Sequence, residues 1–207
     1  MKLVYEFIGT FFLVLTVGMC VLNPHSAGVL APLAIGSVLA TLVYAGGHIS
    51  GGHYNPAVSL AAYIRGKLKL QELGTYWIAQ LIAAIVAAFV VIYFKGKSSD
   101  TPMILDAPKV LLAEFLFTFA LCYVVLNVAT AKSTSGNSYF GFAIGFIVLA
   151  GAYAVGTISG AAFNPAVALG ASILNLTQWA DLWIFIAANL LGGVAAAYVF
   201  KAAHSGE

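Results

Sequence analysis

Apolar runs of about 20 residues alternate with short polar connections along the whole chain. A run of that length is what an α-helix needs to cross the hydrocarbon core of a bilayer. The pattern predicts six membrane-spanning helices, near residues 3–22, 30–48, 73–94, 109–131, 139–157 and 179–201. A soluble helical core would need charged outer faces on most of these helices, and the sequence has too few charges to supply them.

Two further apolar segments, 55–64 and 164–173, have about half the length of a span. We interpret them as re-entrant half-helices. Each begins with Asn-Pro, where Asn caps the first turn and Pro at the first helical position loses no needed hydrogen bond. If they enter from opposite faces, the N-termini at Asn55 and Asn164 meet near the membrane midplane, each with the partial positive charge of a helix dipole.

The two short helices belong to an internal repeat. Shifting the sequence by 109 places Ala34–Leu60 on Ala143–Leu169 with 14 identities in 27 positions. Upstream, the segment that begins at Glu6 resembles the one that begins at Glu114. Each half contains three spans, an odd number, so the second half must be inverted in the membrane. We therefore expect one channel domain over 1–207, made of repeats 1–97 and 109–207 joined by an outer loop 98–108.

Glycine-rich segments, 46–53 and 156–162, precede the half-helices, and we interpret both as non-helical. Irregular backbone at this depth is tolerated where it lines a wet cavity or is buried in protein. The pattern therefore predicts a pore. The backbone carbonyl groups expected to accept hydrogen bonds from permeating molecules are those of Gly51, Gly52, His53, Gly160, Ala161 and Ala162.

Composition agrees with a membrane protein, because 62% of the residues are apolar and 8% are charged, against about a quarter charged in soluble domains. A net charge of +2 gives no reason to expect a nucleic-acid partner. With both termini in the cytoplasm, six basic residues fall inside and three outside, which favours that orientation. The inner group is Lys2, Arg65, Lys67, Lys69, Lys132 and Lys201, and the outer group is Lys95, Lys97 and Lys109.

The sequence closely resembles the aquaporin, or major intrinsic protein, family over practically its whole length. The resemblance rests on the segments His48–Val58 and Ser159–Val167, each with Ser-Gly before Asn-Pro-Ala, on the Glu6 and Glu114 elements, and on Tyr76–Gln80. It implies an all-α bundle of six transmembrane helices and two half-helices, assembled as a homotetramer in the cell membrane. It also implies that Asn55-Pro56-Ala57 and Asn164-Pro165-Ala166 meet in the pore, and that Glu6, Glu114 and His48 support the loops.

The outer selectivity filter departs from the family pattern. Most members carry Arg directly after the second Asn-Pro-Ala, and here the residue is Val167. The only arginine, Arg65, is expected at the cytoplasmic side. Counting from each Asn assigns the other filter positions to Ile35, Ala152 and Ala161. The residue after Val167 is Ala168, where glycerol channels typically carry Asp.

Small, apolar filter residues predict a wide opening that admits water and small neutral permeants such as glycerol, urea or undissociated metalloid acids. Two alternatives stay open. A neighbouring aromatic side chain, Tyr153 or Phe163, would narrow the opening to a strict water channel, or the protein would serve as a membrane junction or scaffold. The isolated His48 and His53 lack the spacing of a metalloenzyme. We therefore expect no enzyme activity, no metal and no cofactor.

Overall fold

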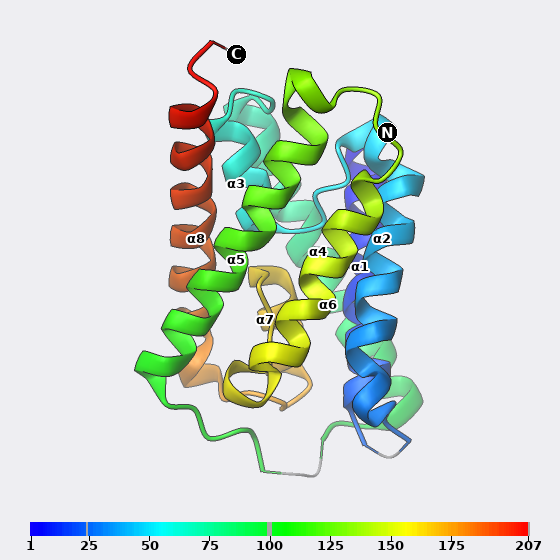
Figure 1. Ribbon diagram of the computed structural model, residues 1–207. Helices are drawn as coiled ribbons and strands as arrows, with labels where there is room; N and C mark the ends of the chain where they lie inside the picture. The colour runs from blue at the N-terminus through cyan, green and yellow to red at the C-terminus, as the bar shows by residue number, and fades with distance from the viewer. Residues whose placement is uncertain (24, 99–100, 207) are drawn as a thin grey trace.

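The computed structural model describes residues 1–23, 25–98 and 101–206. Its described residues contain six helices long and apolar enough to cross a membrane, as the sequence predicted (Figure 1). These helices are α1 (Lys2–Val21), α2 (Ala31–Ser50), α4 (Leu70–Lys95), α5 (Ala107–Thr130), α6 (Phe140–Ser159) and α8 (Leu182–Ala203). Short 3-10 turns, η1 (Gly28–Leu30), η2 (Lys132–Thr134) and η3 (Trp179–Asp181), lie in the connections.

The predicted half-helices are α3 (Pro56–Ile64) and α7 (Pro165–Ile173). In each, the Asn before the proline is the N-cap, and its side-chain oxygen accepts the backbone N–H two residues ahead: Ala57 for Asn55 at 2.8 Å and Ala166 for Asn164 at 2.9 Å. Helix α3 lies in the half of the molecule that holds both termini, whereas α7 lies in the opposite half (Figure 1). Their N-terminal ends therefore approach from opposite sides.

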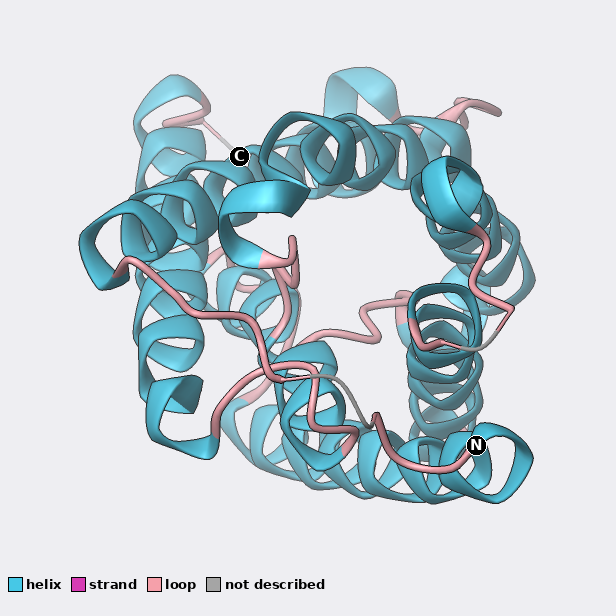
Figure 2. Cartoon of the chain, turned by 90° about the horizontal axis from the view of Figure 1, so that it is seen from below, coloured by secondary structure: helices cyan, strands magenta, loops and turns pink. Residues whose placement is uncertain are grey.

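The long helices form a bundle, which Figure 2 shows end-on, with α1 packed on α4, α5 on α8 and α2 on α6. Both half-helices pack against α4 and α8. The α2–α6 crossing depends on glycine. A Cβ added to Gly36 would lie 2.8 Å from the Gly145 carbonyl oxygen, and a Cβ on Gly145 would collide with the Gly36 carbonyl oxygen. Gly141, one turn earlier in α6, gives room to the ring of Tyr44. Small residues thus let these two helix backbones come together.

The glycine-rich segments are less irregular than the sequence indicated. Helix α2 continues through residues 46–50 and α6 through 156–159, so our interpretation of these parts as non-helical was wrong. Gly46 has space only for hydrogen because the hydroxyl end of Tyr54 lies against its Cα. Each helix ends at a left-handed glycine, Gly51 (φ 92°) or Gly160 (φ 81°), the usual C-cap residue. The non-helical backbone is confined to 51–54 and 160–163.

The outer connection between α4 and α5 lies against the chain that follows α7. The backbone N–H of Met103 donates to the Leu176 carbonyl at 3.1 Å. Residues 99–100 of the predicted loop 98–108 lie outside the described residues. At the same end, the Lys95 ammonium donates to carbonyl oxygens of Met19 and Leu22 at 2.6 and 2.8 Å, which caps the C-terminus of α1.

Candidate functional site

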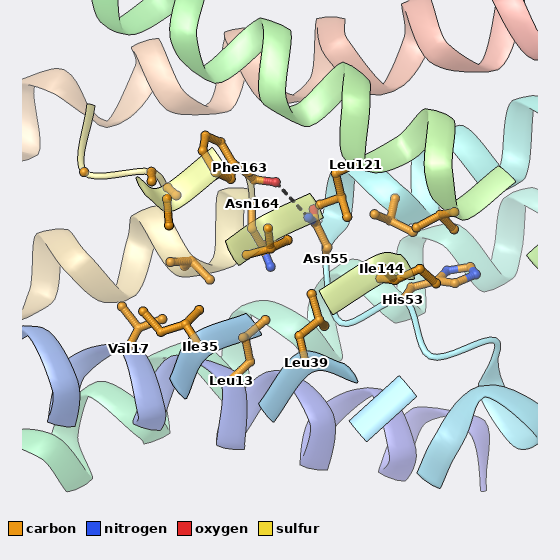
Figure 3. Close-up of a pocket in the computed structure, with 18 of the residues that line it drawn as sticks. Leu13, Val17, Ile35, Leu39, His53, Asn55, Leu121, Ile144, Phe163 and Asn164 are labelled. Atoms are coloured by element: carbon orange, nitrogen blue, oxygen red, sulfur yellow. Dashed lines mark hydrogen bonds between the residues drawn. The ribbon is translucent and has the colours of Figure 1, made fainter. Parts of the chain in front are cut away.

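Asn55 and Asn164 each hydrogen-bond to the loop that carries the other. The Asn55 side-chain amide donates to the Phe163 carbonyl at 2.8 Å (Figure 3). The Asn164 amide donates to the Tyr54 carbonyl at 2.9 Å. An amide NH₂ has two hydrogens, and no second acceptor for either amide occurs among the described residues. Both residues line the same cavity. Each can therefore donate one hydrogen bond to a molecule inside it.

The carboxylate of Glu6 organises the first loop from behind. It accepts hydrogen bonds from the Ser50 hydroxyl at 2.7 Å, the backbone N–H groups of His53 at 3.0 Å and Tyr54 at 2.7 Å, and the Gln80 amide at 2.8 Å. Two donors thus reach each carboxylate oxygen. A protonated carboxyl group would turn its own O–H against one of them, so this arrangement fits an ionised side chain that acts only as an acceptor.

Glu114 repeats this arrangement in the second loop. Its donors are the Ser159 hydroxyl at 2.7 Å, the backbone N–H groups of Ala162 at 2.9 Å and Phe163 at 2.7 Å, and the Asn189 amide at 2.8 Å. Glu6 and Glu114 are both fully buried. A proton relay would need a free O–H or an open acceptor position, and neither carboxylate has one. The contacts therefore favour structural support of the loops.

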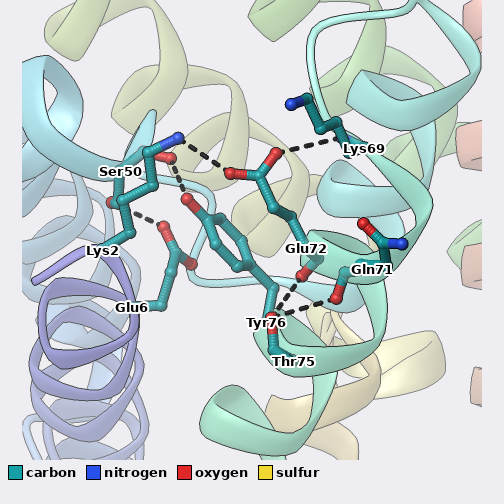
Figure 4. A network of polar contacts seen from close by, with 8 residues as sticks. All are labelled: Lys2, Glu6, Ser50, Lys69, Gln71, Glu72, Thr75 and Tyr76. Atoms are coloured by element: carbon teal, nitrogen blue, oxygen red, sulfur yellow. Dashed lines mark hydrogen bonds and ion pairs between the residues drawn. The ribbon is translucent and has the colours of Figure 1, made fainter.

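The first loop has additional support from α4. The Tyr76 hydroxyl donates to the Ser50 carbonyl at 2.8 Å (Figure 4), and the Trp77 ring N–H donates to the Pro56 carbonyl at 3.0 Å. The His53 ring hydrogen-bonds Ser59 through Nδ1 at 3.1 Å. The segment Tyr76–Gln80 carries part of the family resemblance, but the sequence did not predict its contacts. The partners of these residues lie more than 20 positions away in the chain.

His48 does not have the supporting role that we expected. It lies in the last turn of α2 with an exposed side chain, and within the described part of the chain that side chain makes no hydrogen bond. The reason is that helix α2 continues to Ser50, which turns position 48 outward. Ser50 and His53 make the contacts with Glu6 and Ser59 instead.

A narrow cavity of about 60 Å³ follows the contact between the half-helices. A water molecule needs on the order of 10–15 Å³ of such space, so the cavity has room for a few waters. Its wall is mostly aliphatic, with the two Asn amides, the His53 ring and the loop backbones as polar groups (Figure 3). The lining side chains away from the loops are Leu13, Val17, Val21, Ile35, Leu39, Val58, Leu121, Val125, Ile144, Val148, Ala152 and Val167.

A wider cavity of about 410 Å³ adjoins the narrow one on the side of α7 and the outer loop. The residues that line both cavities mark their junction, and they include all four positions expected to form the filter. The shared residues are Val17, Val21, Ile35, Ala152, Gly160, Ala161, Ala162 and Val167. Of the loop residues expected to line a pore, Gly51 lines neither cavity, whereas Gly52 and His53 line the narrow one.

The two aromatic residues that would narrow the junction lie elsewhere. Tyr153 is 55% exposed, and its hydroxyl donates to the Val29 carbonyl at 2.8 Å. The Phe163 ring is buried and stacks on Phe117, with 5.4 Å between the ring centroids. Gly151 makes room for that ring, because a Cβ there would lie 2.7 Å from it. The Phe163 carbonyl group, and not its ring, faces Asn55 in the cavity wall (Figure 3).

Sequence reasoning missed the contribution of α1. Val17 and Val21 line both cavities, and Leu13 lines the narrow one. Met103 of the outer connection lines the wider cavity. No local signal marks these positions, because an apolar residue on a spanning helix faces lipid, a neighbour or a pore with the same composition.

Comparisons with known proteins agree with this geometry. Six spans around two opposed half-helices, with a lined cavity at their contact, define a membrane channel. The model of the Major intrinsic protein family matches residues 1–200, and the chain belongs to that family of channels. Family membership also decides against an enzyme.

Among its relatives, the chain is 33% identical to Nodulin-26 of Glycine max over 209 residues, with 97% of this chain and 76% of that protein covered. It is 38% identical to Aquaporin TIP1-1 of Arabidopsis thaliana over 168 residues, with 79% and 66% covered. The solved aquaglyceroporin of Plasmodium falciparum has the same fold, with a TM-score of 0.82, 21% identity, and 97% and 94% coverage.

Proposed function

We propose that this channel conducts water together with small neutral solutes, of which glycerol, urea and undissociated metalloid acids are the candidates. The observation that carries the proposal is the junction of the two cavities, where Ile35, Ala152, Ala161 and Val167 come together without a charged side chain. In this proposal the four residues form the selectivity filter. The positions of Tyr153 and Phe163 support a wide opening, since Tyr153 lines neither cavity and the Phe163 ring stacks on Phe117.

The proposed path runs through the Asn55–Asn164 contact. The two amides donate to the oxygen of a molecule at that point, so its own hydrogens point away from the centre. The hydrogen-bonded chain of water molecules is then interrupted at this point, so protons cannot hop along it. The N-terminal ends of α3 and α7 add partial positive charge at the same place, and an apolar wall does not replace the hydration shell of an ion. Neutral solutes are therefore favoured over ions.

The two halves of the chain, 1–97 and 109–207, form one channel domain with inverted topology in this proposal. The matching sets of donors to Glu6 and Glu114 support it. Both termini lie at the end of the bundle that holds α3 (Figure 1), and the excess of basic residues supports a cytoplasmic position for this end.

Large apolar side chains cover the outside of the bundle and support its placement in the lipid bilayer of the cell membrane as a homotetramer. Phe89, Phe142, Phe146, Leu191 and Tyr198 are all exposed on the single chain. Exposed apolar patches of this kind mark contact with lipid or with another subunit. Trp179 and Trp183 are also exposed, near the start of α8, as expected for aromatic residues at a membrane interface.

The decisive experiment compares water, glycerol, urea and a neutral metalloid acid in vesicles that contain the wild-type chain, Val167→Arg or Val167→Leu. We expect the arginine to reduce the flux of the three larger solutes more than that of water. Leucine enlarges the side chain without adding charge and should have a smaller effect. Equal rates in all three proteins would show that Val167 does not define the constriction. Water and glycerol rates at the lipid baseline would support a junction or scaffold protein instead.

A further inference from the structure

The second loop directs its hydrogen-bond donors away from the cavity. The N–H of Gly160 donates to the Gly156 carbonyl, that of Ala161 to the Ser159 hydroxyl, and those of Ala162 and Phe163 to Glu114. By contrast, Gly160, Ala161 and Ala162 line both cavities, and no donor from the described residues reaches their carbonyl oxygens. The loop therefore presents acceptors alone to the junction.

The side chains at the junction add no donor. Val17, Val21, Ile35, Ala152, Ala161 and Val167 are aliphatic. Val17, Val21, Ile35 and Ala152 lie on α1, α2 and α6, where the backbone N–H groups are bonded within the helix.

Two hydroxyl groups line the wider cavity, and both are already engaged. Ser159 donates to Glu114 at 2.7 Å. Thr177 pairs at 3.2 Å with Ser172, whose hydroxyl donates to the Ala168 carbonyl.

The donors of the pore are gathered at its centre instead. The amides of Asn55 and Asn164 each have one free hydrogen there. The backbone N–H of Val167, which has no acceptor among the described residues, belongs to the first turn of α7. It therefore points along the helix axis toward Asn164. A solute coming from the outer side meets acceptors first and donors only after the junction.

We infer that the outer opening selects solutes by their hydrogen-bond donors: the pore conducts small neutral molecules rich in N–H or O–H groups and rejects molecules of similar size that only accept. This inference rests on the proposed function and specifies its substrate class. Urea, glycerol and weak hydroxy acids bring several donors for the carbonyl oxygens of Gly160, Ala161 and Ala162. Dimethyl sulfoxide brings none. It would lose its hydration at the aliphatic wall without any compensating hydrogen bond.

The test compares urea with dimethyl sulfoxide, which have the same number of non-hydrogen atoms. Urea is planar, whereas dimethyl sulfoxide is pyramidal and bulkier, so the pair of variants below controls for size. Permeation is measured by light scattering from vesicles that contain the purified chain, with protein-free vesicles subtracted. An unmade hydrogen bond to a desolvated acceptor lowers a rate about tenfold, so we expect the channel to pass urea about tenfold faster than dimethyl sulfoxide. Comparable channel-mediated rates for the two solutes would overturn the inference.

Two isosteric variants separate donor chemistry from size. Val167→Gln and Val167→Met introduce unbranched side chains of similar length, and only Gln brings N–H donors. We expect the ratio of urea to dimethyl sulfoxide flux to fall several-fold in Val167→Gln relative to Val167→Met. Equal ratios in the two variants would contradict the inference. If either variant fails to insert, Val167→Asn and Val167→Leu provide the same comparison, because these side chains have similar size and only Asn brings N–H donors.

The proposed function and this inference fail in different ways. If neither water nor urea exceeds the lipid baseline, the chain is not a channel for small solutes, and the proposed function is wrong. If water, urea and dimethyl sulfoxide all exceed the baseline at similar rates, the chain is a channel, but its opening does not discriminate by donors.

Discussion

Tyr76 and Phe185 occupy equivalent positions of the repeat at the offset of 109, and only the tyrosine hydroxyl donates a hydrogen bond, to the Ser50 carbonyl at 2.8 Å. Both rings are buried. The neighbouring pair, Gln80 and Asn189, keeps the same role in both halves, since each amide donates to the buried glutamate. The first loop thus has one more buried hydrogen bond at this position than the second, namely the bond from Tyr76 to Ser50 (Figure 4).

Tyr76→Phe should lower the stability of the protein without closing the pore. The substitution leaves the buried Ser50 carbonyl without its donor, which costs about 1–3 kcal/mol. We expect a lower melting temperature in detergent, while the ratios between solute fluxes stay as in the wild type, because Tyr76 lines neither cavity. Tyr93→Phe is the control, since this ring is 86% exposed and should tolerate the change. If neither change alters the melting temperature, the Tyr76 hydroxyl contributes nothing to the stability of the protein.

Glu114→Gln should disrupt the second loop. An amide in place of the carboxylate turns an NH₂ group toward donors from Ser159, Ala162, Phe163 or Asn189. Each lost charge-assisted hydrogen bond costs about 1.5–3 kcal/mol, so folded protein and water flux should both decrease.

The matched control for Glu114→Gln is Glu72→Gln. Glu72 forms an ion pair with Lys2 at 2.9 Å at the surface (Figure 4), and such pairs contribute about 0–1 kcal/mol. Flux should therefore stay near wild type. Normal stability and normal water flux in Glu114→Gln would refute a supporting role for this carboxylate.

Gly145→Ala should separate α2 from α6. The added methyl group would collide with the Gly36 carbonyl oxygen and lie 2.7 Å from the Ala40 Cβ, and overpacking of this kind costs about 1–3 kcal/mol. Gly74→Ala is the comparison, because a Cβ at Gly74 in α4 meets no atom within 4 Å. That change should stabilise the helix by about 0.5–1 kcal/mol. The melting temperatures of both variants are measured side by side. If both shift in the same direction from the wild-type value, α2 and α6 do not cross as closely as described.

The sequence by itself determined the spans, the half-helices and the family. Apolar length and Asn-Pro capping are local properties, so the starts of α3 and α7 were predicted to within one residue. The start of α4 was predicted less accurately, because the helix begins at Leu70, three residues before the predicted span. Its first turn is held by the Glu72 carboxylate, which accepts the Lys69 backbone N–H at 3.1 Å.

Only the tertiary structure decided which apolar residues face the pore and which groups hold the loops. Val17 and Phe12 both lie on α1, yet Val17 lines both cavities and Phe12 is exposed. The extension of α2 past His48, and the bond from Tyr153 to Val29, also depend on partners distant in sequence. Local hydrophobicity fixes that a helix enters the membrane, but its rotation is set by packing against neighbours, and that rotation decides which side chains a permeating molecule meets.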